Sequence, residues 1–192
     1  RDHLAALAPP ETVDLVYHGL DFSRFPKPER SDPPTNSGTD ADNPIRIVSV
    51  GRLVEKKGYD LLLQALAALP ADLAWQFSHI GSGPLHGKLM KQADRLSLSP
   101  RIEWRGAVAQ ADVLATLQSA DIFVLASKIA ADGDRDGLPN VLMEAQSQRL
   151  ACLSTAVSAI PELIEDEITG LLVAPDDAPA LGAALEKLMG AT

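Results

Sequence analysis

Short apolar segments and amphipathic segments alternate from Ile45 to Leu188, and this alternation limits the folds open to the chain more than any other feature. Runs such as Ile122–Ala126 are apolar throughout, which is typical of a strand buried on both faces of a parallel sheet. Segments such as Tyr59–Leu69 instead gather their leucines on one helical face. Strict alternation of strand and helix predicts an α/β fold: a Rossmann-like parallel sheet with helices on both faces and right-handed crossovers.

The predicted elements follow one another closely along this part of the chain. The strands are expected at Ile45–Val50, Leu73–Ile80, Ile102–Trp104, Ile122–Ala126, Leu150–Ser154 and Gly170–Val173. The helices are expected at Tyr59–Leu69, Leu85–Leu96, Gln110–Gln118, Pro139–Gln148, Ile160–Ile164 and Pro179–Leu188. Ligands of such sheets bind at the carboxyl ends of the strands, so the loops that follow the strands are where a site is expected.

The residues before Ile45 have a different composition. We expect residues 1–8 to be the end of a helix and residues 13–17 to form a short strand. Residues 26–44 contain five prolines among Ser, Thr, Asn, Asp and Gly, which cannot bury a core and predict a flexible linker or loop. The compact domain is therefore predicted over residues 45–192. Because the chain opens at Arg1 in mid-pattern, we expect a fragment from which any targeting signal has been cut off.

Charge and cysteine content exclude several classes of function. The 192 residues carry a net charge of −9, which argues against nucleic acid or an anionic membrane as the main partner. Cys152 is the one cysteine, so the chain forms no internal disulfide, which is compatible with a reducing, cytoplasmic compartment. No apolar run reaches the roughly 18 residues that a membrane-spanning helix needs.

An acidic loop lies between a predicted strand and a predicted helix. It begins at Asp132 and ends at the expected start of the helix, with Asp136 near its end and Glu144 further along the helix. At such a helix start, backbone N–H groups and the helix dipole favour an anion. Carboxylates beside such a site do not bind phosphate, but they accept hydrogen bonds from the hydroxyls of a ribose or another sugar. The loop therefore predicts a ligand that contains both phosphate and carbohydrate.

Basic residues follow the first predicted strand, in the loop from Gly51 to Gly58. Arg52 and Lys57 lie at the same expected edge of the sheet, where Arg offers a planar fork to phosphate oxygens and Lys a compact charge. Two fixed cations can stabilise a departing diphosphate without a metal ion. The alternative is that Arg52, Lys56 and Lys57 are solvated surface charges around a turn.

Six short motifs, taken in order, resemble one family of enzymes. They are Gly51-Arg52 with Lys57-Gly58, Gly81-Ser82-Gly83-Pro84, Ile102–Gly106, Ala120–Ser127, Asp136–Ala145 and Ile160–Ile164. Together they resemble the nucleotide-sugar-binding, carboxyl-terminal half of a group 1 (family four) retaining glycosyltransferase of the GT-B architecture. The resemblance covers residues 45–190, and residues 1–25 are similar to the segment between the two halves of such enzymes.

The resemblance implies a role for most of the predicted site. Arg52 and Lys57 would hold the donor diphosphate, and Glu144 the ribose hydroxyls. The family's first glutamate is replaced by Asp136, one methylene shorter, which would orient the donor sugar or have an altered role. On this basis the catalytic residues are Arg52, Lys57 and Asp136.

The remaining donor-binding residues are implied by backbone position. They are Gly51, Gly81, Gly83, Val108, Gly137, Leu138, Pro139, Asn140 and Glu144. Gly106–Val108 matches the place of the base, and Pro139 suits a first helical position because its missing N–H costs nothing there. A plain strand-to-helix turn remains the alternative for Gly81 and Gly83.

The resemblance also implies partners. The donor would be a nucleoside-diphosphate sugar, with no metal or other cofactor, and the acceptor a glycan, lipid or small molecule bound by an amino-terminal domain, without which the fragment is expected to be inactive. The full-length protein would be cytoplasmic, which is compatible with a peripheral position at the membrane. Two alternatives stay open: a GT-B epimerase, and a nucleotide-sugar-binding module without catalysis.

Overall fold

The computed structural model describes residues 14, 16, 18–28, 38 and 40–190. The predicted end of a helix at residues 1–8 lies outside them, as does most of the strand predicted at 13–17. Asp14 and Val16, the two described residues of that segment, belong to no strand.

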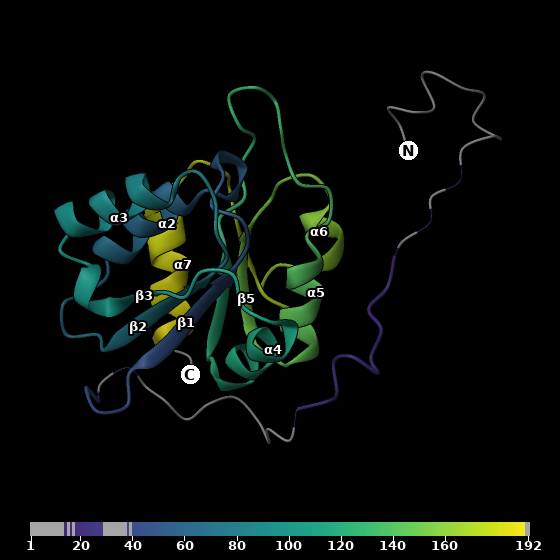
Figure 1. Ribbon diagram of the computed structural model, residues 1–192, viewed down its shortest axis with the longest axis horizontal. Coiled ribbons are helices and arrows are strands. Elements are labelled where there is room, and N and C mark those ends of the chain that lie inside the picture. Colours follow the sequence, from purple (N-terminus) through teal and green to yellow (C-terminus); the bar gives the residue numbers. More distant parts are fainter. Residues whose placement is uncertain (1–13, 15, 17, 29–37, 39, 191–192) are drawn as a thin grey trace.

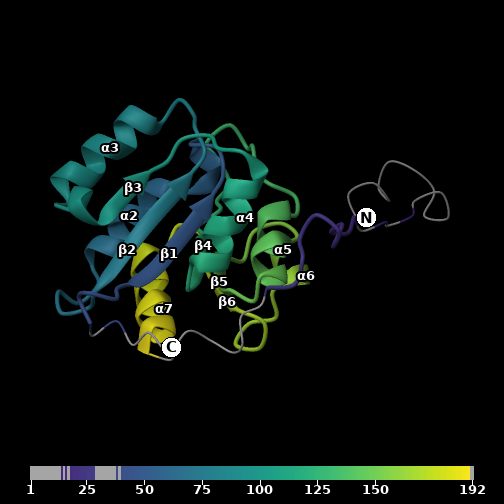
Figure 2. The same ribbon diagram turned by 60° about the horizontal axis from the view of Figure 1, so that its bottom comes forward.

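Within the described residues, six parallel strands form one sheet in the order β3-β2-β1-β4-β5-β6 (Figures 1 and 2). They are β1 (Ile45–Val50), β2 (Trp75–Ile80), β3 (Ile102–Trp104), β4 (Ile122–Leu125), β5 (Ala151–Thr155) and β6 (Leu171–Val173). The chain moves outward from β1 to β3, returns to β4 beside β1, and then moves outward on the other side. This is the strand order of dinucleotide-binding folds, so the prediction of a Rossmann-like sheet is confirmed.

Helices cover both faces of the sheet (Figure 1). They are α2 (Tyr59–Ala67), α3 (His86–Arg95), α4 (Gln110–Ser119), α5 (Asn140–Ser147), α6 (Ile160–Leu163) and α7 (Ala178–Gly190), with short 3₁₀ turns η2 (Glu55–Lys57) and η3 (Ser99–Arg101). Alternate strand residues point to opposite faces. Ile47 and Val124 thus pack beneath α2, α3 and α7, whereas Val48 and Phe123 pack beneath α4, α5 and α6.

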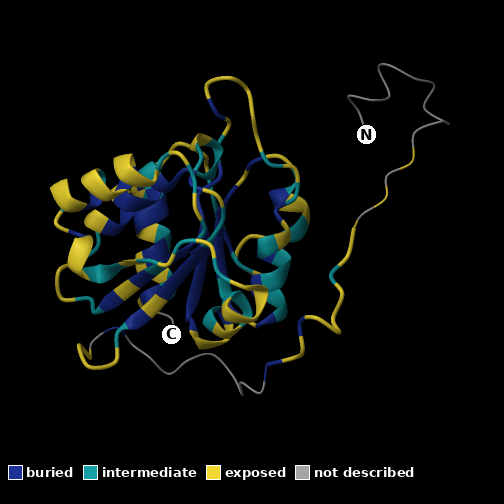
Figure 3. Cartoon of the chain, in the orientation of Figure 1, coloured by how far each residue is buried: buried dark blue, intermediate teal, exposed yellow. Residues whose placement is uncertain are grey.

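Burial is concentrated in the centre of the sheet, where the strands are largely dark in Figure 3, whereas the outer strand β3 has no buried residue. Phe77, Phe123 and Ile122 are at most 1% exposed, whereas the loops at the strand ends are largely exposed. The two hydrophobic layers therefore hold the strand ends, where these loops begin, in fixed positions.

Most predicted boundaries differ by one or two residues from those observed. The strand predicted from Leu73 begins at Trp75, because the ladder with β1 starts at the pair Ile45–Trp75. Ala74 still accepts a hydrogen bond from the N–H of Ile45, but its own N–H donates to Gly38, outside the sheet. Pro139, expected inside the helix, is instead the N-cap of α5, with an extended ψ of 116°. Its carbonyl accepts the hydrogen bond from the N–H of Leu142, so it still begins the helix without needing a donor of its own.

Candidate functional site

A groove of about 500 Å³ lies at the carboxyl edge of the sheet, between the loop after β1 and the loop and helix after β4. From β1 the chain proceeds to β2 on one side of the sheet, and from β4 to β5 on the other. Such a change of direction leaves a crevice outside the strand ends, which is where open α/β sheets bind ligands. The lining residues are Val50, Gly51, Arg52, Val54, Lys56, Lys57, Asp136, Leu138, Pro139, Asn140, Val141 and Glu144.

Glycines allow the loops around this groove to approach one another. Gly58 has a left-handed φ of 63°, and a Cβ there would lie 1.8 Å from the carbonyl oxygen of Ala126 at the end of β4. A Cβ on Gly81 would lie 2.0 Å from the carbonyl oxygen of Gly51, and one on Gly83 would meet the backbone of the same loop at 2.5 Å. The fold itself therefore requires these glycines, which supports the turn interpretation of Gly81 and Gly83.

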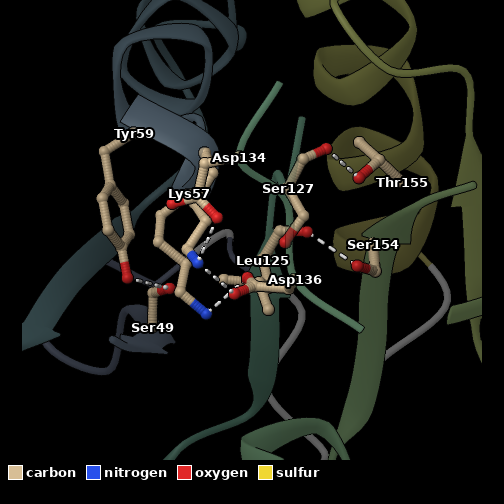
Figure 4. A network of polar contacts seen from close by, with 10 residues as sticks. Ser49, Lys57, Tyr59, Leu125, Ser127, Asp134, Asp136, Ser154 and Thr155 are labelled. Atoms are coloured by element: carbon tan, nitrogen blue, oxygen red, sulfur yellow. Dashed lines mark hydrogen bonds and ion pairs between the residues drawn. The ribbon is translucent and has the colours of Figure 1, made fainter. Parts of the chain in front are cut away.

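Ion pairs join the two sides of the groove (Figure 4). The turn η2 ends in two lysines, and Lys57 Nζ lies 2.7 Å from Asp136 Oδ2. Lys56 Nζ lies 3.0 Å from Asp134 Oδ1 and 3.5 Å from Asp136 Oδ1. The hydrogen bond to Asp134 is the main reason that the pKa of Lys56 is raised. Lys57 and Asp136, both predicted to serve the donor, are thus bound to each other in this structure.

Arg52 differs from the two lysines. Its side chain is exposed and lines the groove, and it forms no ion pair with any side chain that the structure describes. Its planar guanidinium is therefore available to bind two oxygens of a phosphate at once.

The amino-terminal end of α5 is open toward the groove. Its N-cap, Pro139, forms no side-chain cap, and among the described residues no side chain bonds the N–H groups of its first turn, so these groups and the positive end of the dipole can serve an anion. His18 Nε2 lies 2.5 Å from the side-chain oxygen of Asn140, which brings the segment before the domain to the helix start. Gly137 has no left-handed φ, and a Cβ there would meet nothing within 4 Å. The fold therefore does not require glycine at that position, in contrast to Gly58.

Glu144 lies one turn into α5 and also lines the groove. Partial burial raises the pKa of its carboxyl, and the nearby charge of Arg24 opposes that rise. A half-buried carboxylate at this place can accept hydrogen bonds from hydroxyl groups of a ligand.

The structure brings most of the predicted site residues together. Those that line the groove are Gly51, Arg52, Lys57, Asp136, Leu138, Pro139, Asn140 and Glu144. Gly137 directly follows Asp136, while Gly81, Gly83 and Val108 lie on the loops after β2 and β3, which a bond from the Gly81 N–H to the Gly106 carbonyl ties together at 2.8 Å. Lys56 was not predicted as a site residue, although its place beside Lys57 in a short turn was the available signal.

A second, larger cavity of about 690 Å³ lies at the opposite edge of the sheet, beside the first residues of β5 and β6. Leucines make up much of its lining, and its charges include Glu167 and Lys187, which pair with each other at 2.5 Å. No predicted site residue lines it. We therefore assign the ligand site to the first groove, where Arg52 and the N–H groups of α5 converge, although the second cavity is larger.

The described part of the chain contains no group of three or more His, Cys, Asp or Glu side chains placed to hold a metal ion. It also contains no helix of the length and apolar character needed to cross a bilayer.

Known proteins with similar sequences are glycosyltransferases. The chain is 36% identical over 179 residues to the putative colanic acid biosynthesis glycosyltransferase WcaL of Salmonella typhimurium, covering 92% of this chain and 42% of WcaL. It is 39% identical over 146 residues to the amylovoran biosynthesis glycosyltransferase AmsK of Erwinia amylovora, covering 76% of this chain and 36% of AmsK. The chain thus spans less than half the length of these relatives.

Solved structures share the fold. The lipopolysaccharide outer core galactosyltransferase WaaB superposes with a TM-score of 0.76 at 22% identity, over 98% of this chain and 50% of WaaB. HepE of Anabaena, in complex with UDP and glucose, superposes with a TM-score of 0.74 at 20% identity, over 98% of this chain and 49% of HepE. The sequence profile of the family described as "Glycosyl transferases group 1" matches residues 44–191. This chain belongs to the group 1 glycosyl transferases and forms a carboxyl-terminal, Rossmann-like half of the GT-B type.

Proposed function

We propose that this chain is the donor-binding half of an enzyme that transfers a sugar from a nucleoside diphosphate to an acceptor hydroxyl, with retention of anomeric configuration. One observation carries the proposal: Arg52 and Lys57 face the uncapped start of α5 across a groove at the point where the strand order reverses. Cations on one side and N–H groups on the other suit a diphosphate bound between them.

The other groove residues fit the rest of such a donor. Glu144 is placed to accept hydrogen bonds from ribose hydroxyls, and Asp136 from hydroxyls of the donor sugar. Val108 and its neighbours after β3 then lie on the side of the base. HepE, which shares the fold, was solved with UDP and glucose, and this supports a nucleotide sugar as the ligand.

The chemistry follows from where the positive charge lies. The bond between the anomeric carbon and the diphosphate oxygen breaks, and the diphosphate leaves with the electron pair. The acceptor oxygen forms a new bond to the same face of that carbon, and its proton passes to the departing diphosphate. Arg52, Lys57 and the start of α5 stabilise the charge that develops on the leaving group, and no metal is required.

The acceptor is assigned to a part of the protein outside this chain. The chain spans less than half of WcaL and AmsK, and the groove is open on one side. We propose that the acceptor pocket faces this open side and that the chain alone binds nucleotide but transfers sugar poorly.

Titration calorimetry of the 192-residue chain with UDP, GDP and ADP tests the donor site. One diphosphate is expected to bind, and Arg52→Ala is expected to weaken it about 10- to 100-fold, because a charged hydrogen bond contributes about 1.5–3 kcal/mol. Arg95→Ala, which removes an exposed arginine on α3 outside the groove, is the matched control and should leave affinity unchanged. Equal affinities of wild type and Arg52→Ala would contradict the assignment of the diphosphate to this groove.

A comparison of UDP with 2′-deoxy-UDP in the same instrument tests the ribose contact. Wild type should prefer UDP, and Glu144→Gln should reduce that preference, because an amide oxygen accepts more weakly than a carboxylate. An unchanged preference in Glu144→Gln would place the ribose elsewhere.

A further inference from the structure

Lys57, which the proposed function assigns to a donor phosphate, is already paired with Asp136. Their charged atoms lie 2.7 Å apart, and the two side chains are 13% and 14% exposed. Both line the groove, and Figure 4 shows the two side chains directed toward each other from opposite loops. A cation that already holds a carboxylate has to give it up before it can bind phosphate.

Asp136 is well placed to compete with a phosphate for Lys57, whereas its acidic neighbours are not. Asp134, 55% exposed, pairs with Lys56 and does not line the groove. Asp132 is exposed and accepts a hydrogen bond from the N–H of Asp134 within the loop. The carboxylate of Asp136, by contrast, has one oxygen buried within the groove and lies within 3.5 Å of Lys56 as well as Lys57.

The loop that carries Asp136 is also held in place independently of this ion pair. Glu55 accepts a hydrogen bond from the N–H of Ala131 at 3.2 Å, and the N–H of Lys128 donates to the Lys56 carbonyl at 2.8 Å. Lys128 Nζ pairs with Asp60 at 3.0 Å. Release of Asp136 from Lys57 therefore does not release the loop, so the carboxylate can change its partner within the groove.

We propose that Asp136 is an internal substitute for the donor diphosphate. In the free protein it neutralises Lys57, and donor binding transfers Lys57 to the phosphate. The freed carboxylate then accepts a hydrogen bond from a hydroxyl of the donor sugar. This inference rests on the proposed function. It makes Asp136 a residue that selects for the complete donor, because a nucleoside diphosphate without a sugar displaces the carboxylate and offers it no new partner.

Titration of the 192-residue chain with UDP, UDP-glucose and uridine tests this exchange in Asp136→Asn. The variant should bind UDP about tenfold more tightly than wild type, since one charged contact no longer has to be broken. UDP-glucose should gain less, because the amide oxygen of Asn accepts a hydrogen bond from the sugar more weakly than the carboxylate does. Uridine, which has no phosphate, should bind both proteins equally. Asp132→Asn removes the same charge from the same loop and should leave the UDP affinity within about twofold of wild type.

A double-mutant cycle separates the ion pair from simple repulsion of phosphate by a carboxylate. In a Lys57→Met background, Asp136→Asn should give almost no gain in UDP affinity, because the contact it would release is already absent. Melting temperatures verify that each variant is folded, and Asp136→Ser, expected to behave like Asp136→Asn, serves as a second substitution.

The outcomes separate the two proposals. If wild type binds UDP and Asp136→Asn binds it no more tightly, or gains equally in the Lys57→Met background, the exchange is wrong and the donor site stands. An equal gain in UDP affinity in Asp132→Asn would show that the change in net charge alone causes the effect, and it would also overturn the exchange. If no variant binds any diphosphate, the donor site itself is wrong, and the exchange with it.

Discussion

His79 shows how a single residue beside the site constrains the conditions under which the protein is stable. Its side chain is fully buried at the end of β2, and its ring meets that of Tyr59 edge-on with centroids 4.6 Å apart. Burial is the main cause that lowers the pKa of His79 from 6.5 to about 4. The imidazole is therefore neutral in the fold at any pH near neutrality.

The free energy of unfolding should consequently fall as the pH is lowered. The unfolded chain takes up a proton on this histidine below about pH 6.5, whereas the folded protein resists doing so down to about pH 4. The stability that the neutral His79 contributes is therefore fully present above pH 6.5 and is lost progressively between pH 6.5 and pH 4. The loss in the free energy of unfolding reaches about 3 kcal/mol, at about 1.4 kcal/mol per pKa unit. Denaturant unfolding at several pH values measures it.

His79→Leu isolates this contribution from that of the carboxylates. The variant should be less stable than wild type at pH 7, because the new side chain fits the ring cluster poorly, but its stability should depend less steeply on pH between 6.5 and 4. Parallel pH dependences of the two proteins would show that His79 does not carry the effect.

Elements were easier to predict than the arrangement that makes the site. Ile122–Ala126 is apolar throughout because a central strand is buried on both faces, whereas Tyr59–Leu69 has its leucines on one face because a surface helix is buried on one side only. These two periodicities distinguish strands from helices in the sequence. The ends were less accurate, as at Trp75 and Pro139, because hydrogen-bond partners on other segments decide where a ladder or a helix begins. The strand order was left open by the pattern, since alternation alone does not say which strands are neighbours.

The loop after β1 and the end of β4 meet at a position that tolerates only glycine. Gly58→Ala should destabilise the protein by at least about 2 kcal/mol, because the residue has a left-handed φ of 63° and its Cβ would lie 1.8 Å from the Ala126 oxygen. Gly87→Ala, on α3 with nothing within 4 Å of the added Cβ, is the control and should be neutral or stabilising by up to about 1 kcal/mol. Equal denaturation midpoints for the two variants would contradict the close packing at Gly58.

At the scale of the whole molecule, the groove is a small basic region on an acidic protein. The chain carries a net charge of −9, yet Arg52, Lys56 and Lys57 gather at one edge of the sheet. Their position at the same edge of the sheet as the start of α5 was predictable, because both loops follow strands of one parallel sheet. That they meet across one groove depends also on β1 and β4 being neighbours, which the pattern left open. The pairing of Lys57 with Asp136 was not, since it depends on how the loop between β4 and α5 turns back onto η2, and no periodicity determines such a turn.

Two cavities at opposite ends of the strands allow a direct test of where the donor binds. A crystal structure of the chain soaked with UDP should show the diphosphate within hydrogen-bond distance of Arg52 and of the first N–H groups of α5, with the ribose beside Glu144. A nucleotide found instead in the larger cavity, beside Leu150 and Lys187, would contradict the assignment of the donor site.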